Sequence, residues 1–332
     1  PTIITGGIMN NFGQNIYLTD SNYVVVEADE SDGTVFKLNP NILIYLNVDK
    51  EHLDYYKSYT KLKAKIKTYI KKVSKNSLVI LNNDDIFQLD SGNAGPHILF
   101  IGGVHGNEKS GAIYLREYIK NVTITSGKLT VIHTANKCGF KNNTRLVPSA
   151  NRYTGRDINR NFPKTLQDNA RDPNSKKILG YVNDADFILD FHEGYDFHKI
   201  NKNSVGSTLT SSGGCELSEN IAKHIIKILN QNINPINKEN IPAKDREWTH
   251  ISSNPKSQDY ISGFEIKGTL DYYCLIKNKN YILVEITGQN NKQEMDVRLD
   301  QIDIIINSFF NYLLTVSYNG KSLKDTIHLP CI

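Results

Sequence analysis

The stretch Ile98-Leu-Phe-Ile-Gly-Gly-Val-His105-Gly-Asn-Glu108 is the most informative part of this chain. Its apolar first half predicts a buried strand, and its second half places a histidine and a carboxylate three positions apart where that strand ends. An imidazole and a carboxylate are good ligands for Zn²⁺, and a catalytic zinc usually has three protein ligands and one water. The stretch therefore predicts the start of a metal site whose third ligand comes from another strand end.

Two further strand ends carry suitable side chains. The run Phe187-Ile-Leu-Asp-Phe191 predicts a second buried strand and is followed by His192, while Tyr281-Ile-Leu-Val predicts a third that ends at Glu285. Taken singly, a strand-end histidine is more often only hydrogen-bonded, and Glu285 alone would suggest an ordinary ion pair. Their order along the chain favours one shared site.

A polar segment from Asn151 to Pro163 lies between these strands. It contains three arginines, Arg152, Arg156 and Arg160, and has no helical or strand periodicity. A solvated loop can be this polar, but forked guanidinium groups also suit the binding of a substrate carboxylate.

Three motifs together resemble the zinc carboxypeptidase superfamily, and most closely its aspartoacylase and succinylglutamate desuccinylase branch, over about residues 97 to 315. The first is His105-Gly-Asn-Glu108 followed by Lys-Ser-Gly111, the second is Asp157-Ile-Asn-Arg-Asn-Phe162, and the third is Asp190-Phe-His192. The resemblance implies a mostly parallel sheet flanked by helices and an amide hydrolase that uses zinc.

The resemblance also implies a role for each matching residue. Zinc would be held by His105, Glu108 and His192, and substrate by Asn159 and Arg160. Arg152 matches the arginine that polarises the scissile carbonyl in the aspartoacylase branch, and Glu285 would be the general base. Zinc would lower the pKa of a water from 15.7 toward about 7, and cobalt or manganese could occupy the same ligands.

The substrate stays open between two classes, an N-acyl amino acid and a short peptide with a free carboxylate. Only a helix from about Met295 to Leu314 and a short tail follow Glu285, so we expect a more open pocket, as in peptidases. Arg246 is a possible carboxylate anchor or a surface ion-pair partner. The substrate-binding tyrosine is not chosen among Tyr195, Tyr260, Tyr272, Tyr273 and Tyr281.

The first 85 residues resemble a different family. The strings Val26-Glu-Ala-Asp-Glu-Ser-Asp32, Leu38-Asn-Pro40 and Asn47-Val-Asp-Lys-Glu-His-Leu-Asp-Tyr55 are similar to the central ATPase domain of Mur ligases, of the UDP-N-acetylmuramate–L-alanine ligase type. The resemblance implies a magnesium site, vestigial here, at Glu27 and His52. Because no Gly-rich loop of the G-x-x-x-x-G-K-[ST] type is present, Mg²⁺ and ATP are not expected to bind. We expect an incomplete ligase segment, whether a natural fusion, a relic or a gene-model artefact.

The spacing of strands and breakers predicts the domain organisation. We expect a small α/β Mur ligase-like segment at 1–87, a linker at 88–96 and the hydrolase domain at 97–332. In the first segment, buried strands at Tyr23–Glu27, Ile42–Leu46 and Leu78–Leu81 would surround a lysine-rich amphipathic helix. In the second, strands near 97–102, 129–134, 186–191 and 281–286 alternate with helices near 109–121, 173–183, 215–231 and 295–315. This alternation predicts a mostly parallel sheet with helices on both faces.

Composition narrows the function classes. The net charge of +4 over 332 residues gives no global sign of nucleic-acid binding. No apolar run approaches the ~20 residues of a membrane span, and four scattered cysteines fit a reducing cytoplasm. We expect a cytoplasmic zinc hydrolase acting on a small acylated amino acid or peptide. The alternatives are an ATP-dependent, Mur ligase-related protein of peptidoglycan synthesis and a non-catalytic zinc-binding module. The oligomeric state is left open.

Overall fold

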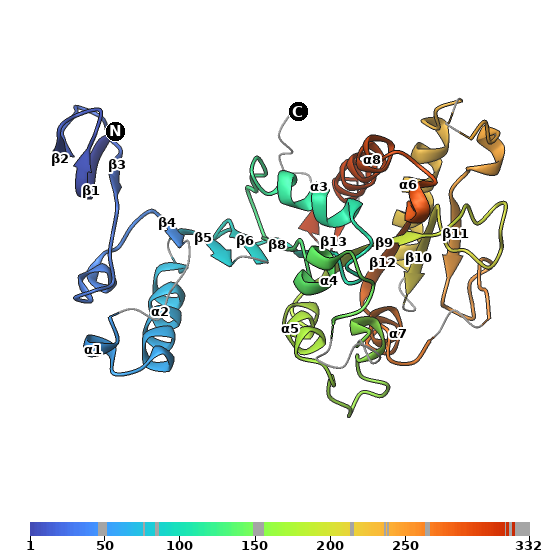
Figure 1. Cartoon of the computed structure of the whole chain (residues 1–332), viewed down its shortest axis with the longest axis horizontal. Helices are drawn as coiled ribbons and strands as arrows, with labels where there is room; N and C mark the ends of the chain where they lie inside the picture. The colour runs from blue at the N-terminus through green and yellow to red at the C-terminus, as the bar shows by residue number, and fades with distance from the viewer. Residues whose placement is uncertain are drawn as a thin grey trace. The chain divides into compact units, whose positions relative to one another are not determined.

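A computed structural model of the chain divides into two compact units, Pro1–Val79 and Ile80–Ile332 (Figure 1). The structure describes residues 1–45, 52–75, 77–83, 86–148, 156–212, 216–235, 237, 239–262, 266–315, 317–318 and 321–322.

The first unit contains a small three-stranded sheet of order β2-β1-β3. Strand β1 (Thr2–Met9) pairs antiparallel with β2 (Gln14–Tyr17) and parallel with β3 (Val24–Val26). The 3-10 helix η1 (Thr34–Lys37), strand β4 (Ile42–Tyr45) and helices α1 (Leu53–Tyr56) and α2 (Tyr59–Val73) follow.

The lysine-rich helix is amphipathic, as the sequence indicates. Helix α2 begins after Ser58, whose side chain accepts a hydrogen bond from the backbone N–H of Lys61 and so caps the helix. Its apolar side buries Leu62 and Ile66 against Tyr56 of α1, while the lysines remain on the solvated side.

The expected burial is wrong for the strands at 23–27 and 42–46, whereas Val79 of the expected strand at 78–81 is buried. Val24, Val25 and Val26 of β3 are all exposed, and in β4 both Ile42 and Ile44 are exposed; Leu46 lies outside the described residues. Valine and isoleucine favour a strand through their branched side chains. Burial, however, needs a covering layer, and the described residues of this unit do not supply one at β3.

The second unit is built on a sheet whose order runs β11-β10-β12-β9-β7-β8-β6-β5. Its centre is parallel: β7 pairs with β8 and β9, and β9 pairs with β12. Antiparallel pairs lie outside this centre, where β10 meets β12 and β6 meets β8, and β11 runs parallel to β10. The bounds are β5 Leu78–Asn83, β6 Ile86–Asp90, β7 His97–Gly102, β8 Lys128–Ile132, β9 Phe187–Gly194, β10 Thr208–Ser212, β11 Thr249–Ser252 and β12 Asn280–Thr287.

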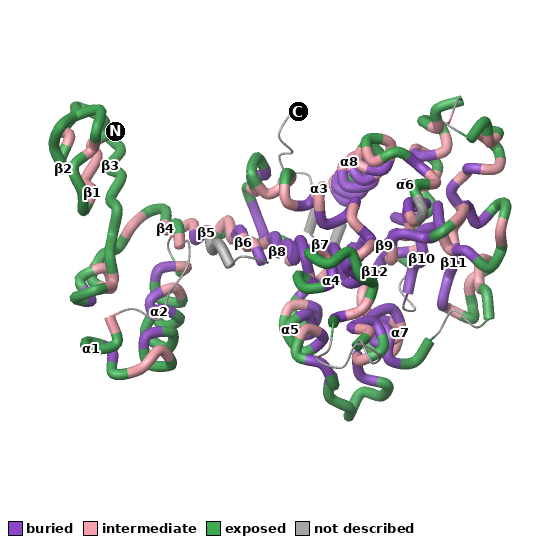
Figure 2. The backbone as a smooth tube through the Cα atoms, viewed as in Figure 1, coloured by how far each residue is buried: buried purple, intermediate pink, exposed green. Residues whose placement is uncertain are grey.

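Helices cover both faces of this sheet, which confirms the predicted fold class (Figure 2). Side chains of β7 alternate between the two layers: Phe100 packs in the cluster with α6 and α8, and Leu99 and Ile101 pack in the cluster with α5 and α7. Both faces of β7 are thus buried against apolar side chains, which explains its unbroken apolar run. The helices are α3 Ser110–Tyr118, α4 Lys137–Asn142, α5 Pro173–Val182, α6 Glu216–Gln231, α7 Leu270–Ile276 and α8 Met295–Leu313.

Shorter elements complete the second unit. The 3-10 helices are η2 Ile158–Arg160, η3 Ala243–Asp245 and η4 Gln289–Asn291, and a short antiparallel pair joins β13 Ser317–Tyr318 to β14 Lys321–Ser322. Among the described residues, no helix combines the length and the apolar character needed to cross a bilayer.

The segment expected to be a linker is partly a strand. Residues 88–90 belong to β6, where Leu89 is buried opposite Leu129 of β8. Gly95 lies so close to Gly127 that an added Cβ would be 2.6 Å from the Gly127 nitrogen. The glycine therefore allows close backbone approach at this point. The compact units divide between Val79 and Ile80.

Close packing of α3 on β9 yields a stability prediction. A Cβ added at Gly111 of α3 would lie 2.6 Å from Phe191 Cβ, whereas one at Gly180 of α5 would meet nothing within 4 Å. We expect Gly111→Ala to lower the free energy of unfolding by about 1–3 kcal/mol through overpacking. Gly180→Ala should instead raise it by roughly 0.5–1 kcal/mol through helix propensity. Denaturant unfolding of both variants measures this, and equal effects would contradict the packing account.

Candidate metal centre

Three nearly fully buried side chains converge near the carboxyl ends of β7 and β9: His105 and Glu108 follow β7, and His192 lies near the end of β9. His105 Nδ1 lies 2.9 Å from Glu108 Oε1, and His192 Nδ1 lies 2.9 Å from Glu108 Oε2. The two Nδ1 atoms are 3.1 Å apart, and each of the three residues is 2% exposed. Two imidazole nitrogens and a carboxylate aimed at one point form a donor set that fits zinc with an open fourth position.

The loop that carries two of these residues is held tightly in place. The backbone N–H of Gly106 donates to the carbonyl of Arg145. A Cβ at Gly106 would lie only 2.0 Å from the carbonyl carbon of Gly139 in α4. Only glycine allows the loop to approach α4 this closely, so residue 106 fixes where His105 and Glu108 point.

Each histidine faces a second carboxylate through its other ring nitrogen. His105 Nε2 lies 3.1 Å from Asp157 Oδ1, and His192 Nε2 lies 3.2 Å from Asp190 Oδ2. The hydroxyl of Tyr281 donates to Asp190 Oδ2 at 3.0 Å. Carboxylates in this position orient metal-binding imidazoles and raise their basicity.

The electrostatics of the site favour a cation. Burial alone lowers the pKa of His192, but Asp190 and Glu108 outweigh it and hold the pKa well above its usual value. Burial alone raises the pKa of Glu108, but the imidazoles of His105 and His192 hold it well below the usual range. The carboxylates thus attract positive charge to the space between the rings, which protons or a metal ion can supply.

Glu285 lies beside this cluster. It occupies the position on β12 that pairs in register with His192 on β9, so both side chains leave the same face of the sheet. Burial is the main cause that raises the pKa of Glu285 to about 8; the charge of Glu108 adds to this, while His192 opposes it. A carboxyl with a pKa near neutrality can accept and return a proton.

The polar segment contributes a turn next to His105. In η2, the side chain of Asp157 accepts from the backbone N–H of Asn159. The Asn159 side-chain oxygen accepts from the backbone N–H of Leu270 at 2.9 Å, and Arg160 Nη1 donates to the Asn159 carbonyl at 2.7 Å. Asn159 and Arg160 therefore follow Asp157, which contacts the candidate metal ligand His105. Arg152 lies outside the described residues.

Two other expected residues lie in the first unit. Glu27 Oε2 accepts from the backbone N–H of Gly6, and His52 precedes α1 with a φ of 53°. Neither belongs to the groups of three or more possible metal ligands found in the described part of the chain.

Such groups include a second one, Glu219, His250 and Asp259. There the ammonium of Lys223 lies 2.7 Å from Glu219 and 2.9 Å from Asp259. Lys223 thus already pairs with both carboxylates, which makes this group a weaker candidate than the buried one.

Arg246 and two of the candidate tyrosines have structural partners. Arg246 is buried and donates to the backbone carbonyls of Ile241 and Asn234 rather than to a carboxylate. Tyr281 donates to Asp190, and Tyr273 donates to Asn183. Tyr195, just after β9, is 40% exposed.

Sequence reasoning missed Arg145, which lies at the site. Its Nη1 lies 2.6 Å from Glu108 Oε1. No motif signals this contact, because the two residues are 37 positions apart and Arg145 lies in a loop with no regular spacing.

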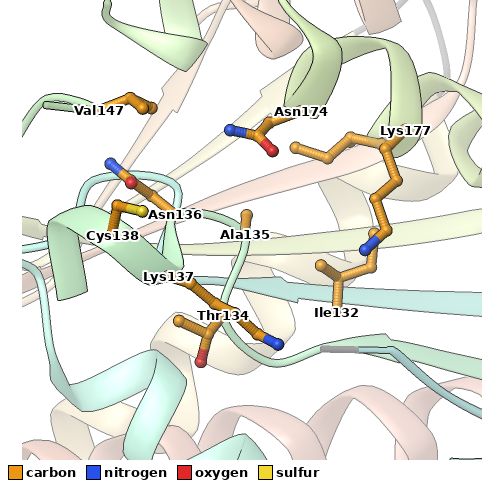
Figure 3. A pocket seen from close by; sticks show the side chains of 10 residues that line it. Ile132, Thr134, Ala135, Asn136, Lys137, Cys138, Val147, Asn174 and Lys177 are labelled. Carbon is orange, nitrogen blue, oxygen red and sulfur yellow. The ribbon is translucent and has the colours of Figure 1, made fainter. Parts of the chain in front are cut away.

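A cavity of about 130 Å³ lies between α5 and the start of α4 (Figure 3). Asn174 and Lys177 of α5 line it, together with residues around the start of α4, among them Asn136, Lys137 and Cys138. The Asn136 side chain donates to the Arg145 carbonyl and accepts from the backbone N–H of Gly139. The cavity therefore borders the segment that supports the candidate centre.

Comparisons with known proteins agree with both resemblances. Residues 94–209 match the succinylglutamate desuccinylase/aspartoacylase catalytic domain family. Among solved structures, the chain is similar to the apo Cell Shape Determinant protein Csd4 from Helicobacter pylori, with 18% identity, coverage of 66% of this chain and 50% of that chain, and a TM-score of 0.52. The mDAP-bound form of Helicobacter pylori Csd4, a D,L-carboxypeptidase, gives 17% identity, 66% and 51% coverage and a TM-score of 0.51. At this identity the likeness shows the fold alone.

Curated relatives agree with the second resemblance, the one to Mur ligases. UDP-N-acetylmuramate–L-alanine ligase of Dictyoglomus turgidum is 46% identical over 84 residues, which are 25% of this chain and 18% of the ligase. The same ligase of Xanthobacter autotrophicus is 51% identical over 73 residues, 22% of this chain and 16% of the ligase. The chain thus spans less than a fifth of the ligases it matches.

Metal analysis tests the candidate centre. We expect the purified protein to bind about one zinc per chain and His192→Ala to lose it, because two ligands in a buried site hold zinc poorly. His250→Ala, in the second group, should keep the zinc. Elemental analysis after zinc loading and buffer exchange measures this. Loss of zinc in the His250 variant alone would show that the second group, and not the buried one, binds the zinc.

The raised pKa of Glu285 predicts a pH effect in chelator-treated protein. Between the usual value near 4.5 and a pKa of about 8, folded Glu285 keeps a proton that the unfolded chain has released. Stability should therefore fall as pH rises through this range. Glu285→Gln removes this titration, so its melting temperature relative to wild type should increase from pH 5 to pH 8. A constant difference would contradict the raised pKa.

Proposed function

We propose that this chain is a zinc-dependent hydrolase that cleaves an amide bond of an N-acyl amino acid or a short peptide with a free carboxylate. The observation that carries the proposal is the buried group His105, Glu108 and His192 with Glu285 beside it in register. The family match over residues 94–209 supports a hydrolase of this class.

In this proposal each residue has one task. His105, Glu108 and His192 would hold the zinc, which supplies a Lewis acid and a water of lowered pKa when bound. Asp157 and Asp190 orient the two imidazoles, as their distances to the Nε2 atoms indicate. Glu285 accepts the proton of the attacking water and returns it to the leaving amine.

Asparagine and arginine residues of the polar segment would bind the substrate. We assign Asn159 and Arg160 to substrate binding and Arg152 to the scissile carbonyl, where preorganised positive charge stabilises a developing oxyanion. The turn that carries Asn159 and Arg160 adjoins His105 through Asp157, which supports their part of this assignment.

A peptide is the favoured substrate class within this proposal. Csd4, which shares the fold, is a D,L-carboxypeptidase, and ligases of UDP-N-acetylmuramate and L-alanine match another part of this chain. We propose residues 1–87 as the ligase-like segment and 97–332 as the hydrolase domain. Both matches favour peptides of cell-wall type over simple acylated amino acids.

Replacement of the proposed base tests the function. We expect Glu285→Gln to lower kcat about 10²–10⁴-fold on a substrate found among cell-wall peptides and N-acyl amino acids. Its zinc content should stay unchanged, because Glu285 is not a proposed ligand. The control Glu117→Gln changes an exposed carboxylate that pairs with Lys120 and should keep full activity.

Two outcomes would count against the proposal. Equal kcat for wild type and Glu285→Gln would remove Glu285 from the mechanism. Stoichiometric zinc with no hydrolysis of any peptide or acyl amino acid would favour a non-catalytic zinc-binding module.

A further inference from the structure

Arg145 occupies an unusual position for a cation at a candidate metal centre. Its Nη1 lies 2.6 Å from Glu108 Oε1, and its side chain is 42% exposed while that of Glu108 is 2% exposed. The guanidinium therefore contacts a buried carboxylate through Nη1, while a large part of the side chain stays accessible to solvent and to a substrate.

The backbone of Arg145 is fixed, so this contact comes from a defined point. The Arg145 carbonyl accepts from the Gly106 N–H at 3.2 Å and from Asn136 Nδ2 at 3.2 Å. Asn136 is itself buried and caps α4. With its backbone carbonyl held by these hydrogen bonds, Arg145 can change its contacts by reorienting its side chain.

Both oxygens of Glu108 have close partners, and Arg145 is the arginine among them. Oε1 receives Arg145 and also lies 2.9 Å from His105 Nδ1 and 3.3 Å from Gln289 Nε2. Oε2 lies 2.9 Å from His192 Nδ1 and accepts from the Glu193 N–H at 3.2 Å. A metal ion between the rings would take over the contacts that His105 and His192 make with Glu108, whereas Arg145, whose charge is permanent, would compete with that cation for the same oxygen.

We propose that Arg145 is a displaceable counter-ion of Glu108, which leaves this carboxylate when the metal binds and then binds the free carboxylate of the substrate. A guanidinium forms two parallel hydrogen bonds to a carboxylate, so the substrate offers an equivalent partner. This inference rests on the proposed function and makes Arg145 a specificity-determining residue for acidic substrates.

The first arm of the test is zinc affinity, measured by competition with a chromophoric chelator. Arg145→Gln removes the competitor for Glu108, so we expect it to bind zinc about three- to tenfold more tightly than wild type. The matched control is Arg156→Gln. Arg156 is 57% exposed and pairs with Asp172 instead of a proposed ligand, so its loss should leave zinc affinity unchanged.

The second arm uses glutarate, a simple dicarboxylate, as the probe of the zinc-loaded protein in titration calorimetry. We expect Arg145→Gln to weaken glutarate binding about tenfold, the loss of one forked contact. Arg145→Lys keeps the charge without the fork and should bind glutarate with intermediate affinity. Neutral glutaramide should not distinguish wild type from Arg145→Gln.

The outcomes separate this inference from the proposed function. Zinc affinity of Arg145→Gln equal to wild type, or glutarate binding unaffected by the substitution, would overturn the role of Arg145 alone. An equal gain in zinc affinity for Arg156→Gln would show a long-range charge effect and would also overturn it. Failure of the wild type to bind zinc would remove both proposals together.

Discussion

The parallel pairing of β9 with both β7 and β12 is the constraint on which the site depends. Because the three strands run in the same direction, their carboxyl ends meet at one edge of the sheet, where ligands bind in folds of this type. The register then sets the details: Glu285 pairs with His192, and Gly102, the last residue of β7, pairs with Phe191. A shift of one residue would turn His192 to the opposite face. Backbone hydrogen bonds between strands therefore determine which side chains meet.

Burying so many ionisable groups requires that each has a partner. Every residue of β9 is buried, including Asp190, His192 and Glu193. Glu193 accepts from the Ser110 N–H at 2.7 Å and pairs with Arg298 Nη1 at 3.0 Å. An unpaired charge here would cost several kcal/mol. The same partners that make the burial tolerable also fix the direction of each side chain, so the polar network is both a stability requirement and the frame of the site.

Much of this was readable in the sequence, because strand ends can be located from apolar runs. His105, Glu108, His192 and Glu285 each follow such a run, and the parallel sheet places them together. What could not be read depends on contacts between distant residues. Strand β10, Thr208–Ser212, is buried yet almost wholly polar, so no apolar run announces it. The glycines near residue 95 indicated a linker, although Gly95 packs on Gly127. Val24–Val26 indicated burial, which depends on a covering layer and not on the strand itself.

The Glu193–Arg298 ion pair has a consequence for the order of folding. Glu193 follows His192 directly, and Arg298 belongs to α8, 105 residues later. Contacts between residues so far apart in sequence form slowly, because closing the long loop between them costs entropy before the contact provides any stabilisation. The strand that carries His192 therefore acquires its final surroundings only once α8 has docked. A metal ion that binds only the completed site stabilises the native state and slows unfolding. Such an ion would act at the last stage of folding, after α8 has docked.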